Sequence, residues 1–402
     1  MGELRTRKRG KCWEYSFEGA KINGKRNPIS KSGFRTKADA IAAGTKAKAE
    51  YDQAGRVFTP STLSVSDYLD YWFENYVKKH LSYNTQRDYE SKIRIHIKPN
   101  LGKYRLAALE PDVIQLWVDD LKIKKGLSKS MISNSLACLS GALNYAVQPC
   151  KYIKYNPCDY VKIPKVPVNR DAQAKTDYIL PVEEWETILA RFSDTHFYLP
   201  LMTGFYAGTR LGESYGIDLL EDVDIENRTL AINHQMQKRD NKIWVLCNPK
   251  YDSFRTIKIG DELVNAFKKE LINRKKNMLK YGQYYLKTYL TDDGTITQAR
   301  ADITVPYKEI WPAAVKESGE LTNTDSFKYC VRVIHYSLNN PLFHHHCLRH
   351  THGTILAENG AWPRTVMERL GHKDIKTTLE RYVFNTDKLQ NDAVDIFERA
   401  VK

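Results

Sequence analysis

A short stretch with two prolines and few bulky side chains divides this sequence and limits the folds that it can adopt. Residues 161–175 contain Pro164, Pro167 and four basic residues. Such a composition is typical of an extended linker rather than a helix or a buried strand. The chain has 402 residues, more than one hydrophobic core usually organises. We therefore predict several domains, with a linker at residues 165–176.

Before the linker, residues 61–164 show a helical pattern. Apolar residues recur at helical intervals in four segments, at residues 65–77, 89–97, 113–121 and 132–147. The turns are marked by residues 99–102 and 126–128. The first half is crowded with basic residues, which suit either a solvated face or phosphate contacts: Lys78, Lys79, Arg87, Lys92, Arg94, Lys98, Lys103 and Arg105. We predict an all-α domain of four or five short helices.

Residues 1–60 have a different pattern. Apolar and polar residues alternate around residues 12–17, with breaks at Gly19 and at Asn23-Gly24, and alternation resumes near Pro28. Thr36 and Asp39 have the spacing of a helix start, and the alanine-rich segment after them predicts a helix to about Tyr51. The pattern indicates a small α+β module with a sheet of about three strands.

This first module carries much of the positive charge. It has fourteen Lys/Arg against six Asp/Glu, a net +8 of the formal +14 of the whole chain. A sequence pI near 9.2 favours a polyanionic partner, above all nucleic acid. A basic tail that only aids solubility, or a plain sheet decoration, is the alternative.

After the linker, residues 177–402 indicate a mixed α/β domain that is mainly helical. We expect helices at residues 181–192 and 197–206, strands at 230–232, 243–245 and 256–259, and several helices near the C-terminus. Residues 385–402 carry an apolar helical stripe, which would pack on its own domain or on a neighbouring protomer.

Cysteine usage and hydropathy exclude some classes. The seven cysteines are scattered and form no C-x-x-C pair, which argues against a disulfide framework and against a cysteine-based zinc site. No apolar run of about eighteen residues is present, and the basic N-terminus lacks the apolar segment of a secretion signal. We expect a soluble protein that stays in the cytoplasm.

The C-terminal segment concentrates groups that can attack a phosphodiester without a metal. Of the eleven histidines, only His346 has an arginine three residues later, Arg349, a helical spacing. His372 follows Leu370-Gly371, which would end a helix. Tyr382 follows Thr377 and Glu380, which have capping-box spacing.

Two further cations precede this segment. Arg210 follows a glycine-bearing turn at the start of a predicted helix, within the sequence TGFYAGTRLGE at residues 203–213. Lys250 lies in the turn between two predicted strands, where we expect a hairpin.

These motifs together resemble those of the tyrosine recombinase (phage-type integrase) family. That family has Arg in a T-G-x-x-x-G-x-R-x-G-E context, a hairpin Lys, H-x-L-R-H, L-G-H and a terminal Tyr, and all six positions match here. The resemblance implies a core-DNA-binding domain at residues 61–164 and a catalytic domain at 177–402. Residues 1–60 are similar to the arm-DNA-binding domain of conjugative-transposon integrases. Residues 282–340 are longer and richer in tyrosine than a minimal member needs.

The resemblance also implies a mechanism. Arg210 and Arg349 would clamp the non-bridging phosphate oxygens, and Tyr382 would attack phosphorus to form a 3′-phosphotyrosyl link. His346 would be the base, Lys250 would protonate the departing 5′ oxygen, and His372 would bond to the phosphate.

Integration or excision of a mobile element would then need neither metal nor ATP. Glu213 would orient Arg210 or His346, or form a plain helix salt bridge.

The implied partners are the core and arm sites of double-stranded attachment DNA, with four protomers in the synaptic complex. A directionality factor and a host DNA-bending protein are further candidates, and the implied location is the bacterial nucleoid.

Three alternatives remain open. One is a zinc-dependent nuclease, using the histidine-rich run that contains His344, His345, His346, His350 and His352. The others are a type IB topoisomerase and a DNA-binding regulator without catalysis.

Overall fold

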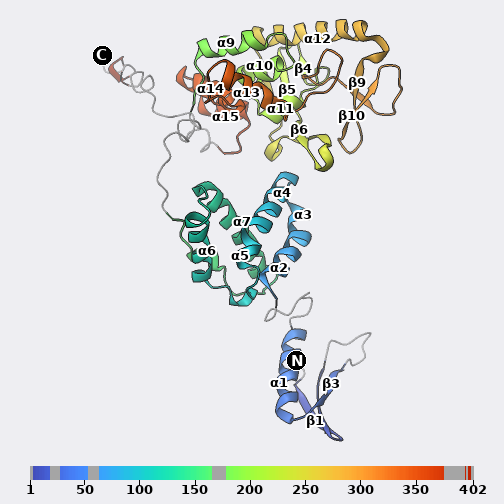
Figure 1. Ribbon diagram of the computed structural model, residues 1–402, viewed down its shortest axis with the longest axis vertical. Coiled ribbons are helices and arrows are strands. Elements are labelled where there is room, and N and C mark those ends of the chain that lie inside the picture. Colours follow the sequence, from blue (N-terminus) through green and yellow to red (C-terminus); the bar gives the residue numbers. More distant parts are fainter. Residues whose placement is uncertain are drawn as a thin grey trace. The chain divides into compact units, whose positions relative to one another are not determined.

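The computed structural model describes residues 3–18, 28–52, 63–164 and 178–374, together with residues 394 and 397–399. The chain divides into two compact units, Met1–Pro167 and Val168–Lys402. Each unit is described by itself (Figure 1). In the part of the chain so described, no helix is both long and apolar enough to cross a membrane.

The N-terminal module is a small antiparallel sheet with one helix. The strands have the order β1-β2-β3, with β1 (Arg5–Arg9), β2 (Cys12–Glu18) and β3 (Pro28–Phe34), and the helix is α1 (Lys37–Asp52). The helix packs on all three strands, and Tyr15, Phe17 and Ala40 are buried. It begins where the backbone N–H of Asp39 donates to the Thr36 hydroxyl at 3.1 Å. The predicted strands and helix start are confirmed, while Gly19, Asn23 and Gly24 lie outside the described residues.

The second part of the first unit is helical. Its elements are α2 (Val65–Trp72), η1 (Phe73–Val77), α3 (Lys78–His80), α4 (Tyr83–Lys92), η2 (Ile93–Ile97), α5 (Lys98–Leu101), η3 (Leu106–Ala108), α6 (Pro111–Ile123), α7 (Lys129–Val147) and η4 (Pro157–Tyr160). The elements α2, η1 and α3 follow one another without a break, as do α4, η2 and α5, so each trio covers one predicted helical segment. Ser64 and Ser128 cap α2 and α7 by accepting backbone hydrogen bonds.

The core of this helical part is rich in aromatic and aliphatic residues. Tyr68, Trp72 and Leu139 are among its most buried side chains. Four of the basic residues that crowd its first half form ion pairs with nearby carboxylates: Lys78, Arg87, Lys92 and Lys98. Local pairing therefore compensates part of the charge that the sequence concentrates there. The predicted all-α character is confirmed.

The second unit combines helices with small sheets. Its helices are α9 (Val182–Phe192), α10 (Tyr198–Ala207), α11 (Leu211–Gly216), α12 (Asp261–Tyr281), α13 (Phe327–Ser337), α14 (His345–Glu358) and α15 (Pro363–Leu370). One antiparallel sheet has the order β4-β5-β8, with β4 (Val223–Asp224), β5 (Thr229–Ile232) and β8 (Arg255–Lys258). A second pair consists of β6 (Gln235–Lys238) and β7 (Trp244–Cys247). The mixed, mainly helical fold agrees with the prediction.

The tyrosine-rich stretch at residues 282–340 forms a third small sheet. Its strands have the order β10-β9-β11, with β9 (Leu286–Leu290), β10 (Ile296–Arg300) and β11 (Lys308–Ile310). Beyond the sheet, Asp218 pairs with Pro312 and Val245 with Thr295 through isolated bridges. The inserted chain is thus joined by backbone hydrogen bonds to the rest of the unit, and α13 returns the chain to the helical core.

Helix α10 lies at the centre of this core. It packs against α9, α11, α12 and α14, and most of its side chains are buried. Helix α15 packs on α14 and on β8. These contacts bring the start of α11, the start of β8 and the end of α15 to one place.

Candidate active site

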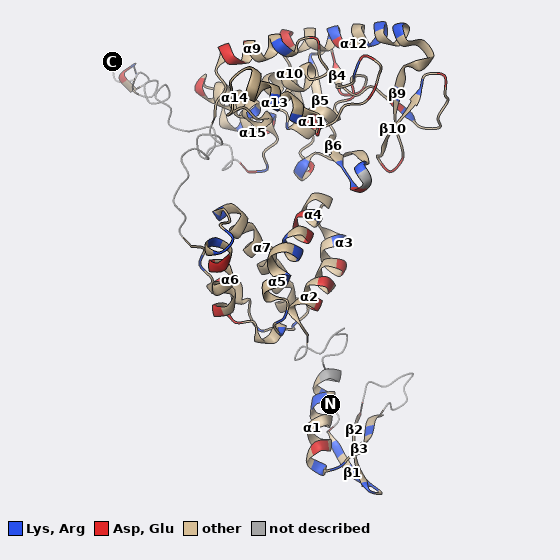
Figure 2. Ribbon diagram, viewed as in Figure 1, with Lys and Arg blue, Asp and Glu red and all other residues tan. Residues whose placement is uncertain are grey.

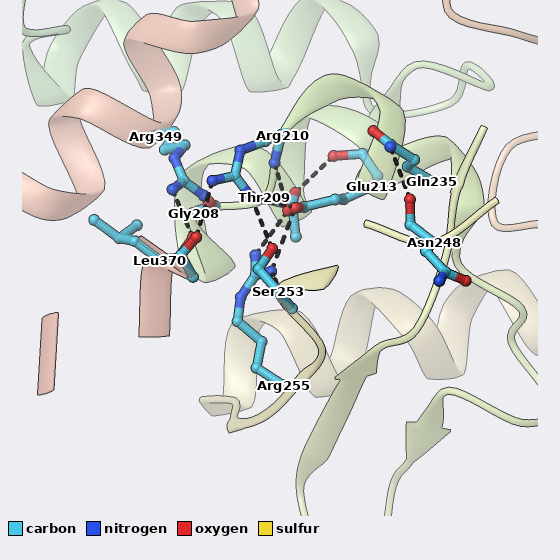
Figure 3. Close-up of polar contacts among 12 residues, drawn as sticks. Gly208, Thr209, Arg210, Glu213, Gln235, Asn248, Ser253, Arg255, Arg349 and Leu370 are labelled. Carbon is cyan, nitrogen blue, oxygen red and sulfur yellow. Dashed lines mark hydrogen bonds and ion pairs between the residues drawn. The ribbon is translucent and has the colours of Figure 1, made fainter. Parts of the chain in front are cut away.

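Arg349 lies in α14 with its side chain buried between the ends of two other helices. It is only 1% exposed. Its Nη1 donates to the carbonyl oxygen of Gly208 at 2.7 Å, and its Nη2 donates to that of Leu370 at 2.5 Å (Figure 3). Gly208 ends α10, and Leu370 is the last residue of α15. Because carbonyls at a helix C-terminus lack partners within the helix and carry partial negative charge, they suit a guanidinium.

Two glycines in the left-handed conformation end these helices. Gly208 has φ +65° and Gly371 has φ +66°, a region that residues with a Cβ rarely adopt. A Cβ on Gly208 would lie 2.6 Å from Cδ2 of Leu370 and 2.8 Å from Cδ2 of His352. The close approach of α10, α14 and α15 therefore depends on this glycine, and the predicted helix end at Leu370-Gly371 is confirmed.

Arg210 precedes the first residue of α11, as the sequence predicts, and its side chain is 20% exposed. Its Nη1 donates to Oε1 of Glu213 at 2.6 Å and to Oγ of Ser253 at 3.4 Å. Its Nη2 donates to the carbonyl oxygen of Gly371 at 3.0 Å. Arg210 and Arg349 thus bind neighbouring carbonyls at the end of α15, immediately before His372.

Glu213 is fully buried and faces these arginines. Its Oε2 accepts the backbone N–H of Arg210 at 2.9 Å and forms an ion pair with Nη2 of Arg255 at 2.7 Å. Burial by itself would raise the pKa of this carboxyl, but the charges of Arg255, Arg210 and Arg349 outweigh it and lower the pKa to about 2. Glu213 is therefore ionised, and its contacts with Arg210 fit both the orienting role and the helix salt bridge that the sequence left open.

Arg255, the first residue of β8, is a site residue that the sequence analysis missed. Its side chain is 7% exposed and contacts Glu213 through two nitrogens. Strand alternation contained a signal, because Arg255 lies two residues before the buried Ile257 and so shares its face. Without the fold, the buried partner of an inward-facing arginine could not be identified.

His346 lies in the first turn of α14 and is exposed, whereas Arg349 is buried. The imidazole of His346 lies perpendicular to that of His350, one helical turn later, with the ring centroids 4.5 Å apart. His372 directly follows Gly371 and is partly exposed, and its backbone N–H donates to the carbonyl of Met367 at 3.1 Å.

Lys250 begins a short 3-10 turn, η6 (Lys250–Asp252), and is exposed. Its Nζ lies 4.9 Å from the ring centroid of Tyr251. The predicted hairpin is wrong, because β7 pairs with β6 while β8 pairs with β5. The turn therefore crosses between two sheets. Ser253, which accepts from Arg210, connects this turn to the arginine cluster.

Tyr382 lies outside the described residues, as do Thr377 and Glu380. The apolar stripe at residues 385–402 is described only in part, with Val394 and Phe397 exposed. The structure thus brings Arg210, Arg349 and His372 together at one helix end and places His346 on the same helix as Arg349. The position of the tyrosine remains a prediction from the sequence.

The side chains of the histidine-rich run have different surroundings. His345 is buried beside Phe327, with ring centroids 5.1 Å apart, and burial lowers its pKa to about 4. The ring of His352 bonds to the Phe205 carbonyl at 2.8 Å. Among the residues described, no group of three or more His, Cys, Asp or Glu side chains is arranged to hold a metal ion. The zinc-site alternative therefore gains no support from the described geometry.

Three protein-family models match this chain in succession. Residues 5–51 match an arm DNA-binding domain, residues 64–122 match the phage integrase N-terminal SAM-like domain, and residues 179–388 match the phage integrase family. The integrase of Staphylococcus phage L54a is 23% identical over 364 residues, covering 85% of this chain and 94% of that protein. The transposase from transposon Tn916 of Enterococcus faecalis is 26% identical over 309 residues, covering 75% of this chain and 70% of that protein.

Solved structures share the fold. The Tn1549 transposon integrase in complex with transposon right end DNA has a TM-score of 0.64 at 22% identity, covering 85% of this chain and all of that one. A lambda integrase dimer bound to a core site has a TM-score of 0.54 at 15% identity, covering 94% of each chain. The match to the integrase family model spans more than half of the chain. The chain therefore belongs to the phage integrase family, the tyrosine recombinases that break and rejoin DNA.

Proposed function

We propose that this protein is the site-specific recombinase of a mobile element and that Tyr382 is its nucleophile. The observation that carries the proposal is the convergence of Arg210 and Arg349 on the last carbonyls of α15, directly before His372. Two arginines that are 139 positions apart in the sequence thus bind adjacent carbonyls, and His372 is the next residue of the chain. Such convergence of cations suits a phosphate group with its spread of negative charge.

The charge of the cluster supports this ligand. Arg210, Arg255 and Arg349 contribute three guanidinium groups, and Glu213 contributes one carboxylate. The cluster therefore keeps a net positive charge after the carboxylate of Glu213 neutralises one of the three guanidinium charges. Fixed cations that face a developing charge stabilise the transition state more than mobile solvent does, and loss of one positioned donor costs about 100-fold or more in rate.

In the proposed reaction the phenolic oxygen of Tyr382 attacks phosphorus and the 5′ oxygen leaves. His346 takes the phenol proton, and Lys250 protonates the departing oxygen, which yields a 3′-phosphotyrosyl link and a free 5′-hydroxyl. His372 bonds to the phosphate. The exposure of His346 and Lys250 leaves both groups accessible to bound DNA. A 5′-hydroxyl from a second duplex then displaces the tyrosine, so no ATP is consumed.

The roles of the other parts follow the same proposal. Residues 1–60 bind arm DNA, residues 61–164 bind core DNA, residues 165–176 link these parts to the catalytic domain, and residues 177–402 catalyse. The first strand of the arm module supports its role, since β1 has the sequence RTRKR, with Lys and Arg blue in Figure 2, and most of its residues are exposed. Four protomers would assemble on two duplexes in the bacterial cytoplasm, at the nucleoid. A directionality factor and a host DNA-bending protein are the proposed accessory partners.

A covalent-trapping experiment tests the function. The protein is incubated with EDTA and a nicked duplex that contains its attachment site, and the products are separated by denaturing electrophoresis. The proposal expects a covalent protein–DNA band that Tyr382→Phe abolishes. Tyr329→Phe is the matched control, because that phenol is exposed in α13 of the same unit.

Other outcomes would reject the proposal in favour of a named alternative. Cleavage that disappears with EDTA indicates the metal-dependent nuclease, and a shifted native band without a covalent adduct indicates a regulator. A covalent adduct that relaxes single duplexes but never joins two indicates a topoisomerase.

A further inference from the structure

Arg255 contacts two segments that are distant in the sequence and also the turn that immediately precedes it. Its Nη2 and Nη1 lie 2.7 Å and 3.3 Å from the two carboxylate oxygens of Glu213. Its Nε donates to the carbonyl oxygen of Arg369 at 2.9 Å, and its Nη1 also donates to that of Ser253 at 3.1 Å. With a side chain only 7% exposed, Arg255 is part of the interior of the site.

Each contacted segment carries one of the proposed active-site residues. Glu213 lies in α11, directly after Arg210. Ser253 follows the turn that begins at Lys250, and Arg369 lies three residues before His372. We propose that Arg255 is a positioning residue that sets Arg210, the Lys250 turn and the His372 turn in register for DNA cleavage. This inference rests on the proposed recombinase function.

The contacts need the shape of a guanidinium. Arginine has five N–H donors in a planar fork, and Arg255 uses them on a carboxylate and on two carbonyls. A lysine ammonium is a point charge that cannot hold the same partners at once. The fork also packs against the turn after α15, since a Cβ on Gly371 would lie 2.9 Å from Nη1 of Arg255. Arg255 therefore both balances the charge of Glu213 and sets the distance between β8 and the turn at Gly371.

Loss of Arg255 would change the ionisation of Glu213. The charge and hydrogen bonds of Arg255 are the largest favourable influences that hold the pKa of this carboxyl low against burial. Without them the pKa of Glu213 rises, and the carboxyl becomes protonated in mildly acidic solution. A protonated Glu213 no longer attracts Arg210 by charge, so the variant should lose activity on acidification faster than the wild-type protein does.

The test compares single-turnover cleavage of nicked attachment-site DNA at saturating protein, normalised to the DNA-bound fraction. Arg255→Met should lower this rate by about 100-fold, as misplacement of reacting groups does, with DNA affinity little changed. Arg255→Lys should lie between Arg255→Met and the wild type. The ratio of the Arg255→Met rate to the wild-type rate should fall as the pH is lowered from neutral to about 5, because the usual carboxyl range is approached.

Arg274→Met is the matched control. Arg274 is also buried, at 3% exposed, and it bonds to Glu270 and to the Pro312 carbonyl between α12 and the inserted sheet. Its loss should lower the melting temperature without lowering the rate per bound enzyme. A double variant of Arg255→Met and Glu213→Gln should be less slow than the product of the two single effects, because both substitutions remove the same Arg255–Glu213 contact.

The inference fails if Arg255→Met cleaves at the wild-type rate per bound enzyme, or if Arg274→Met slows cleavage equally. It also fails if the two site variants are additive. Should Arg255→Met not fold, the cleavage rate of Arg255→Lys per bound enzyme serves as the test. A rate between those of the wild type and Glu213→Gln supports the inference, and a wild-type rate overturns it. A wild-type protein that forms no covalent adduct would instead refute the proposed function itself.

Discussion

Arg349 and Gly208 are joined by a hydrogen bond of 2.7 Å that links a buried guanidinium to the left-handed end of α10. The bond requires a residue without a Cβ at position 208, because the backbone has φ +65° and the space beyond is occupied by Leu370 and His352. The packing of α10 and the orientation of Arg349, a proposed catalytic residue, both depend on this one carbonyl, so a change at Gly208 or Arg349 should affect both stability and DNA cleavage.

Gly208→Ala should destabilise the catalytic unit and slow DNA cleavage. Backbone strain of about 1 kcal/mol adds to the displacement of α14 and α15, so a loss of more than about 2 kcal/mol is expected from denaturant unfolding. Gly360→Ala is the control, because Gly360 has φ +80° but a Cβ added there would meet nothing within 4 Å. Equal losses in the two variants would show that strain alone matters and that the packing at Gly208 does not.

Glu213→Gln should make stability less dependent on acid pH. The folded-state pKa of Glu213 is about 2 against an ordinary 4.5. Its ionisation therefore stabilises the fold fully above about pH 4.5, and this contribution is lost as the pH falls toward 2. At about 1.4 kcal/mol for each pH unit, the contribution is about 3 kcal/mol.

Denaturant unfolding of Glu213→Gln and of the wild-type protein at several pH values measures the contribution of Glu213 to the free energy of unfolding. The stability gap should narrow as the pH falls below 4.5, the ordinary pKa of the carboxyl, and a gap that is constant with pH would contradict the assignment.

His352 should stay neutral well below the usual histidine range. Its Nε2 accepts from Nε of Arg369 at 2.9 Å, so Nδ1 carries the hydrogen that is donated to the Phe205 carbonyl. Burial and the charge of Arg369 lower its pKa to about 4. Because the folded pKa is below the ordinary 6.5, this histidine's contribution to stability is complete above about pH 6.5 and is lost as the pH falls toward 4.

NMR of labelled histidine, with His352→Gln to assign the resonance, checks this prediction. A midpoint near the ordinary 6.5 would mean that the ring is not buried against Arg369 as the structure describes.

Lys250→Met should slow cleavage without lowering stability, because the side chain is exposed and begins a surface turn. If Lys250 protonates the departing oxygen, a 5′-thiol leaving group, which needs no proton, should restore the rate. Single-turnover cleavage of the oxygen and sulfur substrates by wild type, Lys250→Met and the control Lys280→Met measures the effect. Lys280 is an exposed lysine at the end of α12. A sulfur substrate that fails to rescue would assign Lys250 a binding role instead.

The sequence predicted those features that depend on neighbouring residues. The helix start at Thr36 was predicted because its hydroxyl oxygen accepts an orphan backbone N–H group three residues later. Gly371 ends α15 for an equally local reason. The Lys250 hairpin was predicted wrongly because a turn between two strands does not reveal whether those strands pair. Here β7 pairs with β6 and β8 pairs with β5, in two different sheets.

The sequence by itself determined the order of the modules, the start of α1, the end of α15 and, through a family resemblance, the six residues proposed for catalysis, since periodicity, capping and motif spacing are properties of short segments. Only the tertiary structure decided which of those residues meet. The end of α15 binds both Arg210 and Arg349, and the buried Glu213 selects Arg255 as its partner. Such contacts form because a buried charge needs an opposite charge close by, and packing alone determines which distant residue provides it.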